Sequence, residues 1–217
     1  MSRFLFPQWS NALLPTLLVV GALLPLYAVM FVAYGLSPET LEVGYRPEQP
    51  VPFSHALHAG ELGMDCRYCH NTVERAAHAA VPPTQTCMNC HTSIRPESPK
   101  LEKVKASYET GLPVEWIWVN RIADYAYFDH SAHVNRGVGC VTCHGRVDQM
   151  EVVERKRPLS MGWCLECHRD PTNNLRPVSE MTNLAYDQAV ELDEQQRMAL
   201  VNLYHIHPSE NCSTCHR

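Results

Sequence analysis

No cysteine of this 217-residue sequence stands apart from a repeated pentapeptide. All ten cysteines fall in five copies of C-x-x-C-H, in which each cysteine pair is followed directly by a histidine. Structural zinc sites combine such pairs in fours, and a disulfide framework has no use for a histidine after each pair. A zinc protein and a disulfide scaffold are therefore both disfavoured.

The five motifs have the arrangement that fixes a c-type haem. The two thiols add across the vinyl groups of the porphyrin, and the adjacent histidine binds the iron as proximal ligand. The sequence thus predicts five haems c. The cysteines predicted to bind them covalently are Cys66, Cys69, Cys87, Cys90, Cys140, Cys143, Cys164, Cys167, Cys212 and Cys215. The predicted proximal ligands are His70, His91, His144, His168 and His216.

Charged residues are missing from residues 4–38, and this apolar stretch is long enough to span a bilayer. We predict a cytoplasmic N-terminus at residues 1–10 and a transmembrane helix at residues 11–36. A cleaved signal peptide is the alternative, although the apolar run is longer than a usual signal core. Arg3 before the span favours a cytoplasmic N-terminus. Because c-type haems are attached outside the bacterial inner membrane, we expect a single-pass inner (cytoplasmic) membrane protein with a periplasmic or extracytoplasmic haem domain.

The chain beyond the span offers little room for an ordinary core, since only about 36 residues remain for each haem. The porphyrins must therefore supply much of the apolar core. We expect a mostly α fold with extensive loops, made of one N-terminal transmembrane helix and a multihaem cytochrome c domain. Its predicted parts are a Pro-rich extended tether (37–52), a two-haem unit (53–100), a connector (101–127), a second two-haem unit (128–183), and a helix with the fifth haem (184–217).

Two local patterns predict regular structure outside the motifs. Apolar and other residues alternate over 114–119, which predicts a short strand or an extended segment. Small and apolar residues recur near helical spacing over 184–204, which predicts one amphipathic helix.

The two-haem units share a histidine pattern. F-S-H-A-L-H precedes the first motif as F-D-H-S-A-H precedes the third, which makes an imperfect internal repeat. F-x-H-x-x-H before C-x-x-C-H resembles the small multihaem cytochromes of the cytochrome c3 and c7 type. In that family the first histidine is the sixth ligand of the next haem along the chain, and the second reaches a later haem. The resemblance implies the distal ligands His55, His58, His130 and His133; core or surface histidines are the alternative.

Two further distal ligands are expected between paired motifs. His78 lies between the first and second motifs and is the predicted ligand of the second haem. The corresponding segment of the second unit has no histidine, and methionine is the other common distal ligand. Met150 stands nearly in the place of the missing histidine and is the predicted ligand of the fourth haem; Met161, three residues before the fourth motif, is less favoured. His205 and His207 are reserve ligands or loop residues.

Over nearly its full length the sequence resembles the pentahaem membrane-anchored cytochrome c subunit of alternative complex III, a quinol:electron-acceptor oxidoreductase. The resemblance rests on the single span, the five motifs and two runs, C-R-Y-C-H-N-T-V-E-R-A-A-H at 66–78 and P-L-S-M-G-W-C-L-E-C-H-R at 158–169. It implies an electron-transfer subunit of a membrane quinol:cytochrome c (or equivalent acceptor) oxidoreductase. The implied partners are polytopic quinol-site membrane subunits, an iron–sulfur subunit and a monohaem cytochrome c subunit, besides the lipid bilayer.

Two other functions remain to be weighed. A stand-alone membrane-anchored multihaem quinol dehydrogenase would have a haem motif almost directly after the span, whereas here the tether intervenes. A multihaem enzyme such as a nitrite reductase calls for an open catalytic haem, often with lysine in place of a motif histidine, and no motif has one. Of the 12 histidines, seven lie outside the motifs. The chain therefore has enough histidines to give each of the five haems a distal ligand, and no haem need be left open for catalysis. The net charge of −5 suggests no nucleic-acid partner.

Overall fold

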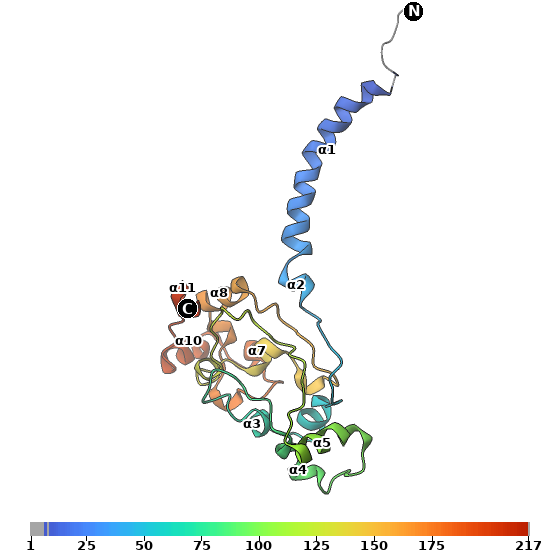
Figure 1. Ribbon diagram of the computed structural model, residues 1–217. Helices are drawn as coiled ribbons and strands as arrows, with labels where there is room; N and C mark the ends of the chain where they lie inside the picture. The colour runs from blue at the N-terminus through green and yellow to red at the C-terminus, as the bar shows by residue number, and fades with distance from the viewer. Residues whose placement is uncertain (1–6, 8, 217) are drawn as a thin grey trace, which may run out of the picture. The chain divides into compact units, whose positions relative to one another are not determined.

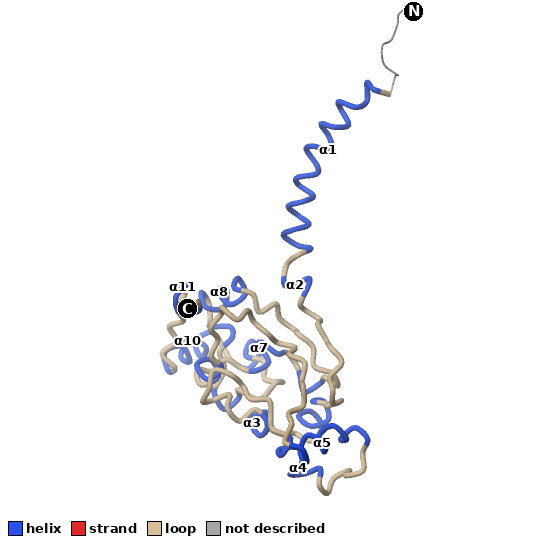
Figure 2. Tube along the Cα trace, in the orientation of Figure 1, coloured by secondary structure: helices blue, strands red, loops and turns tan. Residues whose placement is uncertain are grey.

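The computed structural model describes residue 7 and residues 9–216 (Figure 1). The chain forms two compact units, which divide between Glu42 and Val43. Within the described residues the only β pairing is one isolated bridge between Val138 and Leu175, and Figure 2 shows helices joined by long loops. The expectation of a mostly α fold with extensive loops is therefore confirmed.

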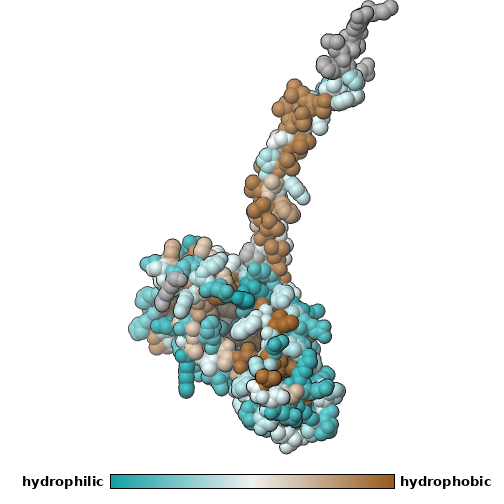
Figure 3. Space-filling model, in the orientation of Figure 1, coloured by the Kyte–Doolittle hydropathy of each residue, from teal (hydrophilic) through white to brown (hydrophobic). Residues whose placement is uncertain are grey.

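The first unit consists of α1 (Ser10–Met30), a π-helical turn η1 (Phe31–Gly35) and the short helix α2 (Pro38–Leu41). The helical run Ser10–Gly35 has 26 residues, none of them buried within the unit, and is long and apolar enough to cross a membrane. Hydrophobic residues line it throughout (Figure 3). The predicted span at residues 11–36 thus corresponds to a helix, whereas Arg3 lies outside the described residues.

Residues 37–52 do not form the wholly extended tether that their prolines predict. Helix α2 begins after Ser37, whose Oγ accepts a hydrogen bond from the backbone N–H of Thr40 at 3.4 Å. This contact satisfies one of the N–H groups that lack a partner at a helix start. Beyond α2 the chain is irregular, and Gly44 and Tyr45 exchange backbone hydrogen bonds with Arg155 of 2.7 and 2.9 Å. The end of the tether is therefore part of the second unit.

The second unit is a succession of short helices, and those that carry the cysteine pairs begin at or a few residues before the first thiol. Asp65, Ser160 and Asn211 cap three of these helices by accepting from backbone N–H groups. Two cysteines three residues apart in one helical turn present their thiols to similar sides. The helices with cysteine pairs are α3 (Cys66–Cys69), α4 (Thr84–His91), α7 (Cys140–His144), α8 (Met161–Arg169) and α11 (Cys212–Cys215).

The remaining helices of this unit connect or support the motif helices. They are η2 (Ala56–Glu61), η3 (Pro99–Leu101), α5 (Glu102–Thr110), α6 (His130–Val134), η4 (Val147–Gln149), η5 (Thr172–Asn174), η6 (Val178–Glu180), α9 (Gln188–Glu191) and α10 (Glu194–Leu203).

Two local predictions can be compared with the structure. Of the two alternatives for residues 114–119, the short strand does not form, because Ile117 bonds through both backbone groups to the side-chain amide of Gln49 and not to a neighbouring backbone. The predicted single helix over 184–204 is split into α9 and α10. Leu192 is extended between them, and Asp193 forms a capping box with Gln196. Since a capping box marks the first turn of a helix, a second helix begins at this point and the first does not continue.

The side-chain core of the second unit is small. One cluster of buried residues comprises Val51, Met88 and Val104, with Trp116 packed against it. The other comprises Val73, Val134 and Met181. A domain of this length ordinarily buries a much larger apolar interior, so apolar material beyond these side chains is needed to fill the fold.

Candidate functional site

All ten cysteines are free thiols in the structure, and eight of them are partly buried. In the described part of the chain no group of three or more histidine, cysteine and acidic side chains is arranged to hold a metal ion. Both thiols of every motif are therefore available for covalent attachment.

Histidine rings face each other in pairs, and each pair joins a histidine of the F-x-H-x-x-H pattern to a motif histidine. The ring centroids are 6.2 Å apart for His58 and His91, 6.5 Å for His130 and His144, and 6.2 Å for His133 and His168. Metal–nitrogen bonds of about 2 Å on both sides of one iron place two imidazole centres roughly 6 Å apart. The spacing therefore fits two axial ligands of one haem.

Each F-x-H-x-x-H turn holds its two histidines around the ring of its phenylalanine. Phe53 lies 4.8 Å from His55 and 4.4 Å from His58 between ring centroids. In the second unit Phe128 lies 4.8 Å from its first histidine and 4.6 Å from its second. Since edge and stacked aromatic contacts fix ring orientation, the phenylalanine directs the two rings to different haem sites.

Backbone carbonyls orient most of these imidazoles. Because a carbonyl oxygen only accepts, the Nδ1 atom beside it carries the proton and Nε2 is left with a free lone pair for iron. Seven rings have such a contact, at 2.7 to 3.2 Å. The acceptors are Ser54 for His58, Ala80 for His70, Ile94 for His91, Ala77 for His130, Asp129 for His133, Ser209 for His168 and Tyr125 for His216.

Burial keeps two further rings neutral. The pKa of His55 is lowered to about 4 by burial and then by the neighbouring rings of His70 and His58. The pKa of His144 is lowered to about 4 by burial and by the surrounding histidines. A neutral imidazole is the form that binds a metal. Nδ1 of His55 is buried without a partner.

The fifth motif differs from the other four. Its helix α11 and His216 are mostly exposed, and the ring of Tyr125 lies 5.8 Å from that of His216. Among the described residues no second histidine ring faces His216, in contrast to His91, His144 and His168. His205 and His207, the reserve ligands, are exposed.

The other predicted distal ligands are not among the paired rings. His78 is exposed, and within the described chain its ring faces no motif histidine; His91 has His58 opposite it. Met150 is buried at 8% exposure, and its carbonyl accepts the backbone N–H of Ala56 at the start of η2. Met161 is 66% exposed.

Two residues of the site carried no signal in the sequence. Nδ2 of Asn120 lies 3.0 Å from Nδ1 of His144, while its Oδ1 is buried without a partner, so turning the amide over lets Oδ1 accept from the ring. Arg176 is 1% exposed and occupies the space that a Cβ at Gly139 would need, directly before Cys140. Neither residue lies near a motif in sequence, so neither could be found from spacing.

Comparison with known proteins agrees with this geometry. Residues 51–107 and 126–217 match the family model described as cytochrome c7 and related cytochrome c. The chain is also 28% identical over 183 residues to the "Menaquinone reductase, multiheme cytochrome c subunit" of Nitratidesulfovibrio vulgaris, covering 79% of this chain and 78% of that protein. Motif helices, paired histidines and family match coincide over the second unit. The chain belongs to the family of cytochrome c7 and related cytochromes c, and is a multihaem electron-transfer protein.

Proposed function

We propose that this chain carries five covalently bound haems c and relays electrons between a membrane quinol-oxidising module and a further acceptor. The observation that carries the proposal is the set of opposed histidine rings 6.2 to 6.5 Å apart. When both axial positions are occupied by histidine, no substrate can bind the iron. The chain's residues then hold the redox groups and keep other ligands out.

The ligand sets follow from the ring pairs. His58 is assigned to the second haem, His130 to the third and His133 to the fourth, opposite the motif histidines that they face. His55 is assigned to the first haem, because it has the place in its F-x-H-x-x-H turn that His130 has in the second unit, where His130 faces the first motif histidine of that unit. His133 thereby replaces Met150 in the proposal for the fourth haem, and His58 replaces His78 for the second.

The helix Ser10–Gly35 supports a membrane anchor. We propose a single-pass protein of the inner membrane with residues 43–217 on the periplasmic or extracytoplasmic side. Its proposed partners are polytopic quinol-site subunits, an iron–sulfur subunit and a monohaem cytochrome c, as in alternative complex III. The named relative from Nitratidesulfovibrio vulgaris favours a second candidate, in which the same relay delivers electrons to menaquinone.

The haem count has a direct test. The intact mass of the denatured chain should exceed that of the polypeptide by five haems, since a thioether bond survives denaturation and every motif has both thiols. A Cys212→Ala/Cys215→Ala variant should carry four. A smaller increment in the parent chain would contradict the proposal.

The relay role is tested by supplying quinol. The purified chain in detergent should be reduced completely by dithionite and remain oxidised with a soluble quinol, because one membrane helix cannot enclose a quinone. The intact complex isolated from membranes is the positive control. Quinol-dependent reduction of the chain alone would favour a stand-alone multihaem quinol dehydrogenase.

A further inference from the structure

We infer that the five haem sites form a single row in the order second, first, third, fourth, fifth, so that the second and fifth sites are its ends. The inference rests on the proposed binding of five haems and adds their spatial order, which differs from their order along the chain. Four contacts, one for each neighbouring pair of sites, carry it.

The second and first sites are joined by one turn. His55 and His58 lie on either side of a single ring, that of Phe53, at 4.8 and 4.4 Å between centroids. His58 faces His91 of the second motif. His55 has the place in this turn that His130 has in the second unit, where His130 faces the first motif histidine of that unit. Asn89, between the thiols of the second motif, also donates to the hydroxyl of Tyr68, between the thiols of the first, at 3.3 Å. Two ligands three residues apart cannot serve distant haems, so these sites are adjacent.

The first and third sites are joined by the loop that follows the first motif. Ala80 accepts a hydrogen bond from Nδ1 of His70 at 2.8 Å, and Ala77 accepts one from Nδ1 of His130 at 2.8 Å. Two carbonyls three positions apart thus hold the proximal ligand of one site and the distal ligand of the other. The two two-haem units are therefore in contact through the first and third sites, the first site of each unit.

Helix α6 joins the third and fourth sites in the same way as η2 joins the first two. Its histidines face different motif histidines, His130 that of the third motif and His133 that of the fourth. Phe128 contacts both rings, at 4.8 and 4.6 Å. The internal repeat is thus a repeat of one turn, in which a phenylalanine and two histidines hold two neighbouring haem sites.

The fourth and fifth sites are joined at the end of the chain. Ser209, three residues before the fifth cysteine pair, accepts from Nδ1 of His168 at 2.7 Å. Glu210 pairs with Arg169 at 3.1 Å, next to that histidine. The residues directly before α11 therefore contact the proximal ligand of the fourth site and its neighbour.

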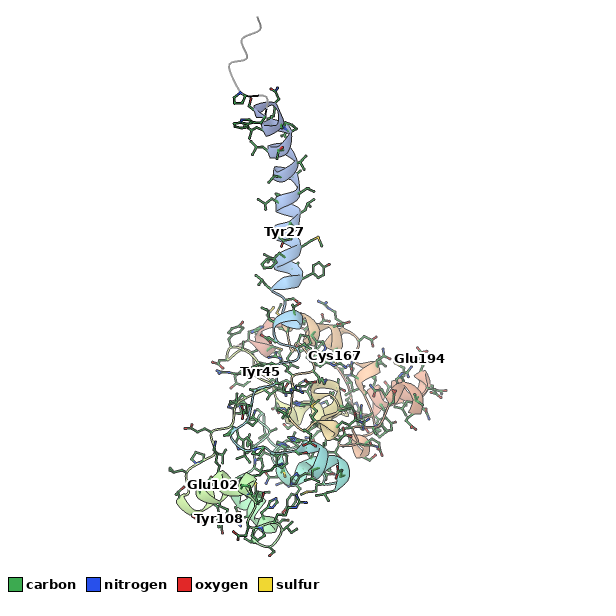
Figure 4. The ribbon with its side chains drawn as sticks, turned by 90° about the vertical axis from the view of Figure 1, so that its right-hand side faces the viewer. Tyr27, Tyr45, Glu102, Tyr108, Cys167 and Glu194 are labelled. Carbon is green, nitrogen blue, oxygen red and sulfur yellow. The ribbon has the colours of Figure 1, made fainter. Side chains whose placement is uncertain are left out.

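The arrangement of the helices agrees. Figure 1 shows α4 with α5 at one end of the second unit, α8 and α11 at the other, and α7 between them. Figure 4 likewise places Glu102 and Tyr108 of α5 far from Cys167 of α8. The exposed cysteines are Cys90 and Cys212, one in each end motif. Electrons therefore enter and leave at the second and fifth sites and cross the interior through the other three.

The order is testable by electron paramagnetic resonance, because the angle between two axial rings shapes the signal of a low-spin haem. The ring planes are 65° apart at the second site, 9° at the third and 39° at the fourth, so the third site has a distinct signal. We would compare His58→Met with His133→Met in the detergent-solubilised full chain during a reductive titration. A methionine ligand raises the potential, so the altered site is reduced first and loses its paramagnetism.

Loss of a paramagnetic neighbour narrows a signal. The signal of the third site should narrow early in His133→Met and stay unchanged at that stage in His58→Met. If methionine does not bind the iron, the altered haem becomes high spin. The signal of the third site should then still change in His133→Met and stay unchanged in His58→Met. If the chain carries five haems by mass but the third-site signal narrows in His58→Met and not in His133→Met, the proposed order is wrong and the proposed function is unaffected. A count below five haems would contradict the proposed function.

Discussion

Replacing His133 by alanine should leave one haem without its sixth ligand and convert it from low spin to high spin. The ring of His133 lies 6.2 Å from that of His168, and the carbonyl of Asp129 accepts from its Nδ1 at 2.7 Å, which fixes the ring opposite His168. Met150→Leu should leave every haem low spin, because the proposed ligand sets do not use Met150, whose side chain is buried and whose carbonyl accepts the N–H of Ala56 at the start of η2.

The comparison is made by absorption and electron paramagnetic resonance of the oxidised full chain. A high-spin signal from one haem is expected for His133→Ala and none for Met150→Leu, with the exposed Met161→Leu as matched control. Disappearance of a near-infrared thioether-to-iron band in Met150→Leu would restore Met150 as a ligand. An unchanged low-spin spectrum of His133→Ala would remove the histidine from the fourth site.

The second large effect is expected at Arg176. Its guanidinium is buried, donates to the carbonyl of Asn183 at 3.0 Å and to Oε1 of Gln188 at 2.9 Å, and lies 5.3 Å from the ring centre of Tyr186. Arg176→Met should lower the free energy of unfolding by about 3 kcal/mol, because the two hydrogen bonds of a buried charged donor are lost. It should also lower the potential of the third haem, since a positive charge next to Cys140 disfavours the oxidised iron.

Guanidinium denaturation and a redox titration measure the two effects. Gly139→Ala should reproduce both, because its methyl group would displace the Arg176 side chain. Arg121→Met is the control: the side chain is 68% exposed and pairs with an exposed Asp124, so its loss should change stability by less than about 0.5 kcal/mol. Equal effects of Arg121→Met and Arg176→Met would contradict the structural role.

The haem-binding helices could be predicted because their chemistry is local. A motif of five residues contains both thiols and one ligand, and the turn that presents them forms from those residues and a cap such as Asp65. The long apolar helix was predictable for the same reason, since its composition alone decides its environment. The internal repeat also indicated that His130 and His133 are distal ligands of two different haems.

The partners of the motif histidines depend on contacts between distant segments. Spacing favoured His78 and Met150 because they lie between paired motifs, yet His58 faces His91 across 33 residues and His133 faces His168 across 35. The residues that orient the ligands are often backbone carbonyls, such as those of Ala77 and Ala80, for which side-chain identity gives no indication. The break at Asp193 was missed because apolar periodicity does not register a capping box.

The two small buried clusters have a consequence for biogenesis. A polypeptide that buries so few apolar side chains has little to offset the entropy cost of folding before its cofactors are attached. We expect the newly exported chain to stay open and accessible to the enzymes that form the thioether bonds. Each attached porphyrin then supplies apolar surface to its neighbours, so maturation and folding of the second unit proceed as one process.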